Sequence, residues 1–406
     1  MAAMRPAPIL AAIVLAAAVP AAAAQDRDAA PVAVSEAERF RADARAIEPL
    51  VNRAYAYLDR FDGGVMPVSA RLRAEAERVT DRRSLLLYAE RALLALADHH
   101  AITGASFADS WAIVPSYADL WIERSGDSYL IEAVRDGSPA QQAGVKAGDR
   151  LVSVGGFATQ TAVDWFWRDL GLEPAPGRAA FAARILAAGR RGPPRRMTIQ
   201  TGASPPRALE LPSLYAAPRA ARPAVSADER GDALVVRIHD SLGDPATVAA
   251  FDAAMAPARP GQRVVIDLRD TPSGGNSNVA RAILGWFVDR PTPFQIHSLP
   301  IEQRETGIAR QWIEQVLPRA GKRHAGPVTV WVGRWTGSMG EGLAIAFDAI
   351  GARVTGSRMA GLLGAIHDHR LEHSGLIIKL PTERLMHVNG TSREAFVPRR
   401  RARDIR

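Results

Sequence analysis

The 406-residue chain contains no cysteine. This absence excludes disulfide bonds, a thiol nucleophile, thiolate metal sites and lipid attachment to a cysteine after the N-terminal apolar run. Beyond residue 24 the chain also lacks an apolar stretch long enough to cross a bilayer. The aromatic-plus-basic pattern of nucleic-acid-binding proteins is missing as well, so we expect no nucleic-acid partner.

The positive charge of the chain is placed unevenly. The formal net charge is +8, and the last eight residues, 399–406, hold five arginines and one aspartate. Much of the basic excess therefore belongs to this tail rather than to a folded surface. We expect the tail to be solvated, with at most a weak contact with anionic envelope surfaces.

The N-terminus has the three parts of an export signal. Arg5 precedes an apolar stretch over residues 9–19, and three alanines at 22–24 precede the polar Gln25. A short apolar core followed by small residues is typical of a cleaved signal peptide, whereas a membrane anchor needs a longer run. We therefore predict cleavage near Ala24 and a periplasmic or secreted mature protein.

Hydrophobic spacing changes twice along the rest of the chain. A helical pattern comes first, with helices expected over 36–60, 70–78 and 80–96. Short strands separated by Gly and Pro follow, and apolar strands then alternate with helices, which is typical of a largely parallel, layered α/β domain. The predicted regions are a signal peptide (1–24), a helical N-terminal segment (25–106), a PDZ-like domain (107–215), an α/β core (216–398) and a basic tail (399–406).

The most specific local pattern is GSPAQQAGVKAGD at 137–149. Its Pro139 starts a short helix, a glycine caps the helix, and a turn leads into a strand over 150–154. This pattern resembles the corresponding stretch of bacterial PDZ domains, which bind an extended C-terminus by strand addition.

The PDZ resemblance implies a carboxylate-binding loop formed by Ala118, Asp119, Leu120 and Trp121. The family prefers glycine in this loop, and the Asp119 carboxylate would repel a bound C-terminus. Two uses of the domain therefore stay open, namely the binding of substrate C-termini and a regulatory role.

A charged, glycine-rich loop, DLRDTPSGG at 267–275, follows the apolar strand over 264–268. Such a loop presents backbone N–H groups, but it lacks the lysine and the spacing of a phosphate-binding loop. It resembles the D-L-R-x-N-x-G-G segment of the C-terminal processing (tail-specific) serine proteases, with one extra residue before the glycine pair. The resemblance implies that Gly274 or Gly275 donates an N–H to an oxyanion hole.

The segment TGSMGE at 336–341 follows the strand over 328–332. It resembles the S-A-S-A-x-E nucleophile motif of the same family, which makes Ser338 the implied nucleophile. Ser-x-x-Glu is also a helix capping box, and the two roles are compatible because a helix N-terminus stabilises developing negative charge. The Met339 N–H would complete the oxyanion hole.

A serine nucleophile needs a base. The commonest branch of the family uses a lysine within G-K-G, but the corresponding segment here, MAGLLG at 359–364, has none. A second branch, similar to the tricorn core protease, uses Ser, His and Glu, with the His in D-x-H and the Glu before G-V-x-P. The matching residues are His100, in DHH at 98–100, and Glu394, before AFVP at 395–398.

Other histidines offer weaker alternatives. His367 and His369 are spaced to share one face of a strand, which suits a metal as well as a polar strand surface. We favour the polar surface and expect no metal and no cofactor. His367 and His239 are reserve candidates for the base.

The resemblance covers residues from about 85 to 398. It implies a crotonase-like layered α/β protease core with an inserted PDZ domain, in which Ser338 attacks a peptide carbonyl, His100 transfers the proton and Glu394 orients His100. We therefore expect an exported serine endopeptidase with polypeptide substrates. A catalytically inactive peptide-binding protein of the same fold and a small-ester hydrolase remain as alternatives.

Overall fold

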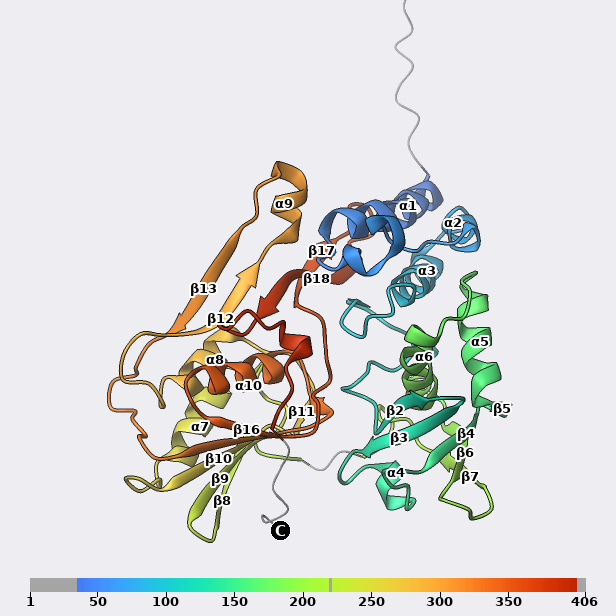
Figure 1. Cartoon of the computed structure of the whole chain (residues 1–406). Helices are drawn as coiled ribbons and strands as arrows, with labels where there is room; N and C mark the ends of the chain where they lie inside the picture. The colour runs from blue at the N-terminus through green and yellow to red at the C-terminus, as the bar shows by residue number, and fades with distance from the viewer. Residues whose placement is uncertain (1–34, 219–220, 400–406) are drawn as a thin grey trace, which may run out of the picture. The chain divides into compact units, whose positions relative to one another are not determined.

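The computed structural model describes residues 35–218 and 221–399 (Figure 1). The predicted signal peptide, and the predicted tail apart from Arg399, lie outside the described residues. Within the described ranges, no helix combines the length and the apolar character that a membrane crossing requires.

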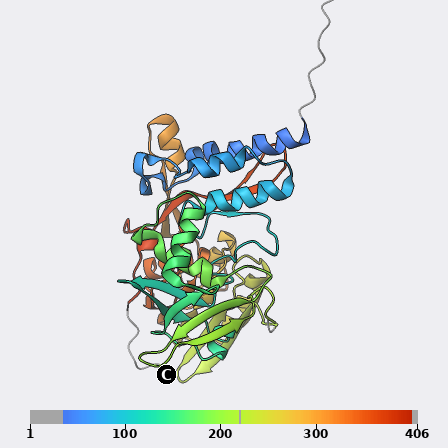
Figure 2. The same ribbon diagram turned by 90° about the vertical axis from the view of Figure 1, so that its right-hand side faces the viewer.

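Three helices begin the described chain: α1 (Glu36–Ala54), α2 (Ala70–Ala76) and α3 (Arg82–Leu94). Helices α1 and α3 lie side by side and share a buried apolar face (Figure 2). The predicted first helix ran to residue 60, but α1 ends at Ala54. The chain leaves the helix because the Ala56 N–H donates to the Pro381 carbonyl at 2.8 Å, and only the short 3-10 turns η1 (Leu58–Arg60) and η2 (Asp62–Gly64) follow.

The PDZ segment is an antiparallel sheet with three helices. Its strand order is β2-β3-β4-β6-β7, and β5 pairs with β4. As the sequence predicted, Pro139 is the first residue of a short helix, and Ser138 caps that helix. The elements are β2 (Leu120–Ser125), β3 (Ser128–Val134), α4 (Pro139–Gln142), β4 (Arg150–Val154), β5 (Phe157–Ala158), α5 (Thr159–Asp169), α6 (Pro176–Ala188), β6 (Arg195–Gln200) and β7 (Arg207–Leu211).

The core contains the expected largely parallel sheet, in the order β16-β14-β10-β9-β8. Strands β9 (Ala233–Ile238), β10 (Arg263–Asp267), β14 (Val328–Val332) and β16 (Arg353–Gly356) run parallel, and β8 (Val225–Arg230) is antiparallel to β9. The helices that alternate with these strands are α7 (Ala246–Met255), α8 (Ser277–Leu284) and α10 (Met339–Ala349).

A second, antiparallel sheet was not predicted. Its order is β1-β18-β12-β13, β17 also pairs with β18, and helix α9 (Pro300–Thr306) joins β12 to β13. The strand implied by the spacing of His367 and His369 is present as β17, but partly polar strands such as β13 lack the continuous apolar pattern that predicts a strand. The strands are β1 (Ile102–Thr103), β12 (Thr292–Ser298), β13 (Gln311–Val316), β17 (Ala365–Arg370) and β18 (Ile377–Met386).

Helix α10 lies between the two core sheets, against β14 and β16 on one side and β12 on the other (Figure 1). Residues 340–347 are consequently all buried. A short parallel pair, β11 (Asp270–Thr271) with β15 (Trp335–Thr336), leads the chain into the N-terminus of α10. The fold is thus mixed α/β, and Ser338 is placed where β15 meets α10.

Candidate active site

Ser338 sits in a strained backbone conformation at the start of α10. Its φ is 50° and its ψ is −115°, a combination that residues with a side chain rarely adopt and that costs roughly 1–3 kcal/mol. The surrounding hydrogen bonds hold this conformation: the Ser338 N–H donates to the Glu341 carboxylate at 3.0 Å, and the Ser338 carbonyl accepts the Glu341 N–H at 3.0 Å. The Ser-x-x-Glu spacing therefore fixes the turn that presents the hydroxyl.

Glu341 is completely buried and organises a second segment around Ser338. Besides the Ser338 N–H, its carboxylate accepts the N–H groups of Gly361 at 2.8 Å and Leu362 at 3.1 Å. Burial raises the pKa of Glu341 to about 7, against the opposing effects of the Arg393 cation and these N–H donors. The sequence motif contained this residue, but the motif alone did not show its contact with 361–362.

His100 and Ser338 meet although 238 positions separate them in the chain: His100 Nε2 lies 3.1 Å from Ser338 Oγ. The other ring nitrogen, Nδ1, lies 2.6 Å from the Leu363 carbonyl oxygen. Because a carbonyl only accepts, Nδ1 carries the proton and Nε2 is free to accept the Ser338 hydroxyl proton. Burial, with the nearby Arg393 cation, lowers the pKa of His100 to about 4, so the ring is neutral at pH 7.

The backbone before His100 is anchored by Asp98. The Asp98 carboxylate accepts the His100 N–H at 2.9 Å and the Tyr55 hydroxyl at 2.9 Å, and burial raises the pKa of Asp98 to about 6. His99 points elsewhere and stacks on Phe181 with ring centres 4.4 Å apart. Of the two adjacent histidines, only His100 reaches Ser338.

Arg393 holds the segment that supports His100. Its guanidinium is buried and donates to the carbonyls of Leu362 at 2.7 Å and Gly364 at 2.8 Å, on either side of Leu363. Segment 359–364 contains no lysine, and it contributes to the site through main-chain carbonyl and N–H groups. Sequence reasoning missed Leu363 and Arg393, because a backbone carbonyl has no side-chain signature.

Glu394, the predicted orienting carboxylate, makes no hydrogen bond to His100 within the described residues. Its Oε2 atom is buried without a hydrogen-bond partner there, and the side chain lines a cavity of about 190 Å³ together with Glu341 and Arg334. The structure therefore places Leu363, rather than Glu394, against His100 Nδ1. The role of Glu394 stays a prediction.

The glycine loop lies directly over the nucleophile. A Cβ atom at Gly274 would come within 2.9 Å of Ser338 Oγ, and one at Gly275 would come within 2.6 Å of the Leu242 backbone, so both positions require glycine. Within the described residues, the N–H groups of Gly274, Gly275 and Met339 have no hydrogen-bond partner. Free N–H groups beside the nucleophile are what an oxyanion hole needs.

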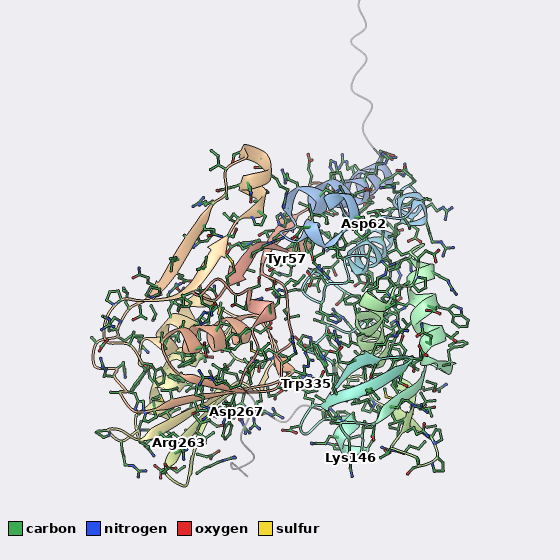
Figure 3. The ribbon with its side chains drawn as sticks, in the orientation of Figure 1. Tyr57, Asp62, Lys146, Arg263, Asp267 and Trp335 are labelled. Carbon is green, nitrogen blue, oxygen red and sulfur yellow. The ribbon has the colours of Figure 1, made fainter. Side chains whose placement is uncertain are left out.

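The predicted carboxylate-binding loop of the PDZ domain is buried at all four positions, 118–121. Asp119 does not face a ligand, because its two oxygens accept from Arg195 at 2.6 and 3.0 Å. The Ala118 carbonyl accepts the Trp335 indole N–H at 2.7 Å, and Trp335 lies where the core faces the PDZ strands (Figure 3). The Arg195 cation thus neutralises the Asp119 carboxylate, which removes the expected repulsion of a bound C-terminus.

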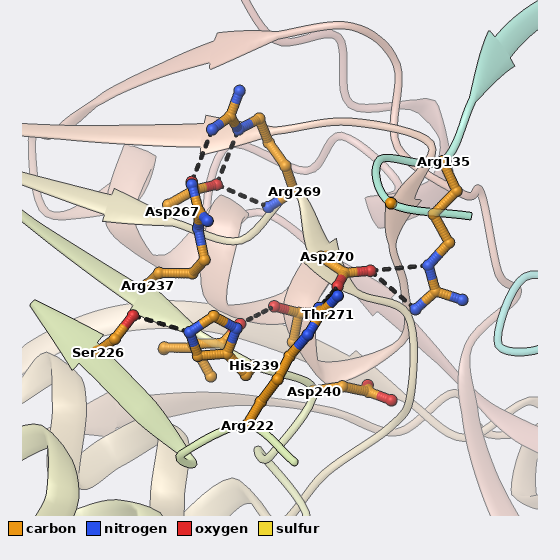
Figure 4. Close-up of polar contacts among 12 residues, drawn as sticks. Arg135, Arg222, Ser226, Arg237, His239, Asp240, Asp267, Arg269, Asp270 and Thr271 are labelled. Atoms are coloured by element: carbon orange, nitrogen blue, oxygen red, sulfur yellow. Dashed lines mark hydrogen bonds and ion pairs between the residues drawn. The ribbon is translucent and has the colours of Figure 1, made fainter. Parts of the chain in front are cut away.

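Ion pairs also join the PDZ domain to the two short strands that flank the site. Arg334 donates to Glu132 at 3.1 Å and to Glu123 at 3.3 Å. On the other strand, Arg135 and Arg222 both donate to Asp270, at 2.8 and 2.6 Å (Figure 4). The PDZ domain therefore contacts both β11 and β15, which lead to the glycine loop and to Ser338.

His239 and His367, the reserve candidates for the base, contact other side chains. His239 Nε2 lies 2.8 Å from the Ser226 hydroxyl, and His367 lies 2.6 Å from the Thr382 hydroxyl and 3.3 Å from Glu383. In the part of the chain that the structure describes, no three His, Asp or Glu side chains are arranged to hold a metal ion.

Comparison with known proteins supplies the class of this site. Residues 233–397 match the sequence profile of peptidase family S41, and residues 130–165 match that of the PDZ domain. With this match over the core, the protein is a serine-type peptidase. Polypeptides are the substrates that a peptidase of this kind implies. No curated protein matches the chain.

Solved structures share the S41 fold at low sequence identity. The photosystem II D1 C-terminal processing protease is 18% identical, with a TM-score of 0.54 over 91% of this chain and 94% of that one. Mature CPAF is 13% identical, with a TM-score of 0.55 over 90% of this chain and 92% of that one. These likenesses show the fold alone, so membership of the Ser/His/Glu branch stays a prediction.

Proposed function

We propose that this S41 peptidase cleaves polypeptides by acyl transfer, with Ser338 as the nucleophile and His100 as the general base. One observation carries the proposal, namely the 3.1 Å contact between Ser338 Oγ and a His100 nitrogen that is unprotonated. The strained turn at Ser338 supports the proposal. Backbone strain of this kind persists only where the surrounding structure holds it, and such positions cluster at active sites.

The chemistry follows from these positions. His100 Nε2 takes the hydroxyl proton as Ser338 Oγ attacks the peptide carbonyl, and it returns that proton to the leaving amine. The N–H groups of Gly274, Gly275 and Met339 are the candidate donors to the oxyanion. Water then attacks the acyl-enzyme in the reverse sequence, with His100 again acting as the base.

The Leu363 carbonyl takes the orienting position in this proposal. It fixes the His100 tautomer in the same way as a carboxylate would, but it supplies only a dipole to the imidazolium formed during attack. The buried acids Glu341 and Asp98 lie around the site, and Glu394 lines the adjoining cavity. We propose that Glu394 stabilises the His100 imidazolium through its negative charge and does not orient the His100 ring.

Labelling and proteolysis test the proposal. A fluorophosphonate should label Ser338 in the intact protein, and the protein should cleave an unfolded polypeptide such as casein. Ser338→Ala should lose both, and His100→Ala should lose several orders of magnitude in rate. Labelling without cleavage of any polypeptide would favour the small-ester hydrolase, and the absence of labelling would favour the inactive peptide-binding alternative.

For the PDZ domain we propose a regulatory role rather than the capture of C-termini. Strand β2 lies at the edge of its sheet, where a peptide strand would add, and helix α6 packs against it. Arg184 of α6 donates to the Ile122 carbonyl at 2.9 Å, a group of the kind that an added strand would bind. Peptides with a free and with an amidated C-terminus should therefore be cleaved with equal KM; a KM much lower for the free carboxylate would overturn this role.

Export remains part of the proposal. It rests on Arg5, the apolar stretch over 9–19 and the alanines at 22–24. N-terminal sequencing of the mature protein from the envelope fraction should begin at or near Gln25, whereas an intact Met1 on cytoplasmic protein would contradict it. A weak contact of the basic tail with anionic surfaces stays a proposal of the same kind.

A further inference from the structure

The glycine loop that covers Ser338 is held by the segment that follows β9. At one end of the loop, Asp240 binds Ser273; at the other end, the Leu242 carbonyl accepts the Asn276 N–H at 2.8 Å. Between these two anchors lie Gly274 and Gly275, whose N–H groups have no partner within the described residues. The segment 240–242 thus fixes both ends of the glycine loop.

Asp240 makes the stronger of the two anchors. One carboxylate oxygen accepts the Ser273 N–H at 2.7 Å, and the other accepts the Ser273 hydroxyl at 2.8 Å. The Asp240 backbone adopts a left-handed conformation with φ of 55°, which aspartate tolerates better than most residues. The Asp240 carboxylate and Asp270 of β11 line the same cavity.

Few other hydrogen bonds hold the loop near Ser273. Thr271 of β11 donates its hydroxyl to the Ile238 carbonyl at 3.0 Å, which fixes the strand before the loop. Residues 272–275 then leave the β11–β15 pair, and the next bond to another segment after Ser273 is that of Asn276. On its outer side, Asp240 lines a cavity of about 460 Å³ shared with Arg135 and Arg222.

We propose that Asp240 is a positioning residue for the peptidase reaction, holding Ser273 so that the N–H groups of Gly274 and Gly275 stay aimed at the oxyanion. This inference rests on the proposed function, since it assigns the loop to the oxyanion hole. Asp240 touches neither Ser338 nor His100 in the structure. It acts on the transition state through the loop, because oxyanion donors contribute only when they are already placed where charge develops.

The test compares Asp240→Asn and Asp240→Gly with the matched control Asp244→Asn. Asp244 lies four residues on and is exposed, and within the described residues its carboxylate accepts only the Ala246 N–H. Asp240→Gly permits the left-handed backbone while removing both bonds to Ser273, and Asp240→Asn keeps one acceptor. Ser273→Ala removes the hydroxyl bond and leaves the N–H bond in place.

For Asp240→Gly, kcat should fall by roughly 10²–10³-fold with KM nearly unchanged, the size seen on loss of an oxyanion donor. A peptidyl boronic acid, which forms a tetrahedral adduct with serine, should lose affinity in parallel. Asp240→Asn and Ser273→Ala should show smaller losses of the same kind, and Asp244→Asn should behave as wild type. A higher KM with unchanged kcat, or equal effects of the Asp240 and Asp244 variants, would overturn the proposal.

Amide hydrogen exchange separates this inference from the proposed function. Exchange in a peptide covering residues 271–278 should be faster in Asp240→Gly and unchanged in Asp244→Asn, whether or not a substrate is cleaved. If exchange is unchanged in Asp240→Gly, the positioning role fails. If wild-type Ser338 resists fluorophosphonate while the exchange difference is present, the proposed function fails and the anchor itself stands.

Discussion

At the scale of single residues, the surroundings of His100 determine its protonation state and its tautomer. Burial and the Arg393 cation lower its pKa, and the main chain at Leu363 sets its tautomer. An exposed histidine would be half protonated near pH 6.5. The buried ring remains unprotonated over the whole neutral range, which is the state that a general base requires.

The pH profile should reflect this environment. Because the pKa of His100 is lowered to about 4, protonation removes the base only near that pH. We expect the acid limb of kcat/KM assigned to His100 to lie near pH 4, well below that of an exposed histidine. A limb near 6.5 would contradict it. A limb near 7 that disappears in Glu341→Gln would instead belong to Glu341, whose pKa is raised to about 7.

The Glu394→Gln variant tests whether the Glu394 carboxylate orients His100. The change keeps size and removes charge. Because Leu363 already holds Nδ1, we expect kcat to fall less than about tenfold, with the fluorophosphonate reaction of Ser338 retained. A fall of roughly 10²–10⁴-fold would restore the carboxylate to the orienting role predicted from the sequence. Truncation after Pro398 is the control, since it removes the arginines and leaves Glu394.

At the scale of elements, the sequence predicted those parts of the site that consist of side chains in continuous motifs. Ser338, the glycine loop and His100 were found, because each follows or precedes a recognisable strand or helix. Leu363 was not, because its contribution is a carbonyl group. The antiparallel sheet was also missed, since its partly polar strands carry weak periodicity and their pairing depends on contacts distant in the chain.

The segment 361–364 should depend on Arg393. Arg393→Lys keeps the charge, but the lysine side chain is shorter than that of arginine, so its ammonium group cannot reach the position from which Arg393 Nη2 donates to both the Leu362 and Gly364 carbonyls. A buried carbonyl left unpaired costs about 1–3 kcal/mol, so we expect a loss of this size in the free energy of unfolding and a lower kcat. Urea denaturation and steady-state kinetics measure the two effects.

Arg358→Lys is the matched control for Arg393→Lys. Arg358 is exposed, and its side chain makes no hydrogen bond or ion pair within the described residues. Its replacement should change stability by no more than about 0.5 kcal/mol. If both variants lose activity and stability equally, the bracing role of Arg393 is wrong.

At the scale of the whole molecule, the PDZ domain and the core are joined next to the chemistry. Trp335 donates to Ala118 of the PDZ domain and stands three residues before Ser338. Trp335→Phe keeps an aromatic ring and leaves the Ala118 carbonyl unpaired. We expect a loss of about 1–3 kcal/mol and a lower kcat, measured by denaturation and kinetics.

The control for Trp335→Phe is Trp312→Phe, in β13, where the ring stacks on His297 at 4.8 Å and lies outside the PDZ contact. That variant should leave kcat unchanged. If Trp335→Phe is also silent, the contact between the domains is not coupled to the site, and the regulatory role proposed for the PDZ domain loses its physical route.

The burial of the nucleophile has a consequence for how the enzyme meets its surroundings. Ser338 is 9% exposed and His100 is 6% exposed, beneath the glycine loop and segment 361–364. Because so little of the reacting pair meets solvent, we expect a flexible, extended chain to reach Ser338 more readily than the rigid surface of a folded protein does. Cleavage rates on the native and the unfolded form of one substrate would measure this preference.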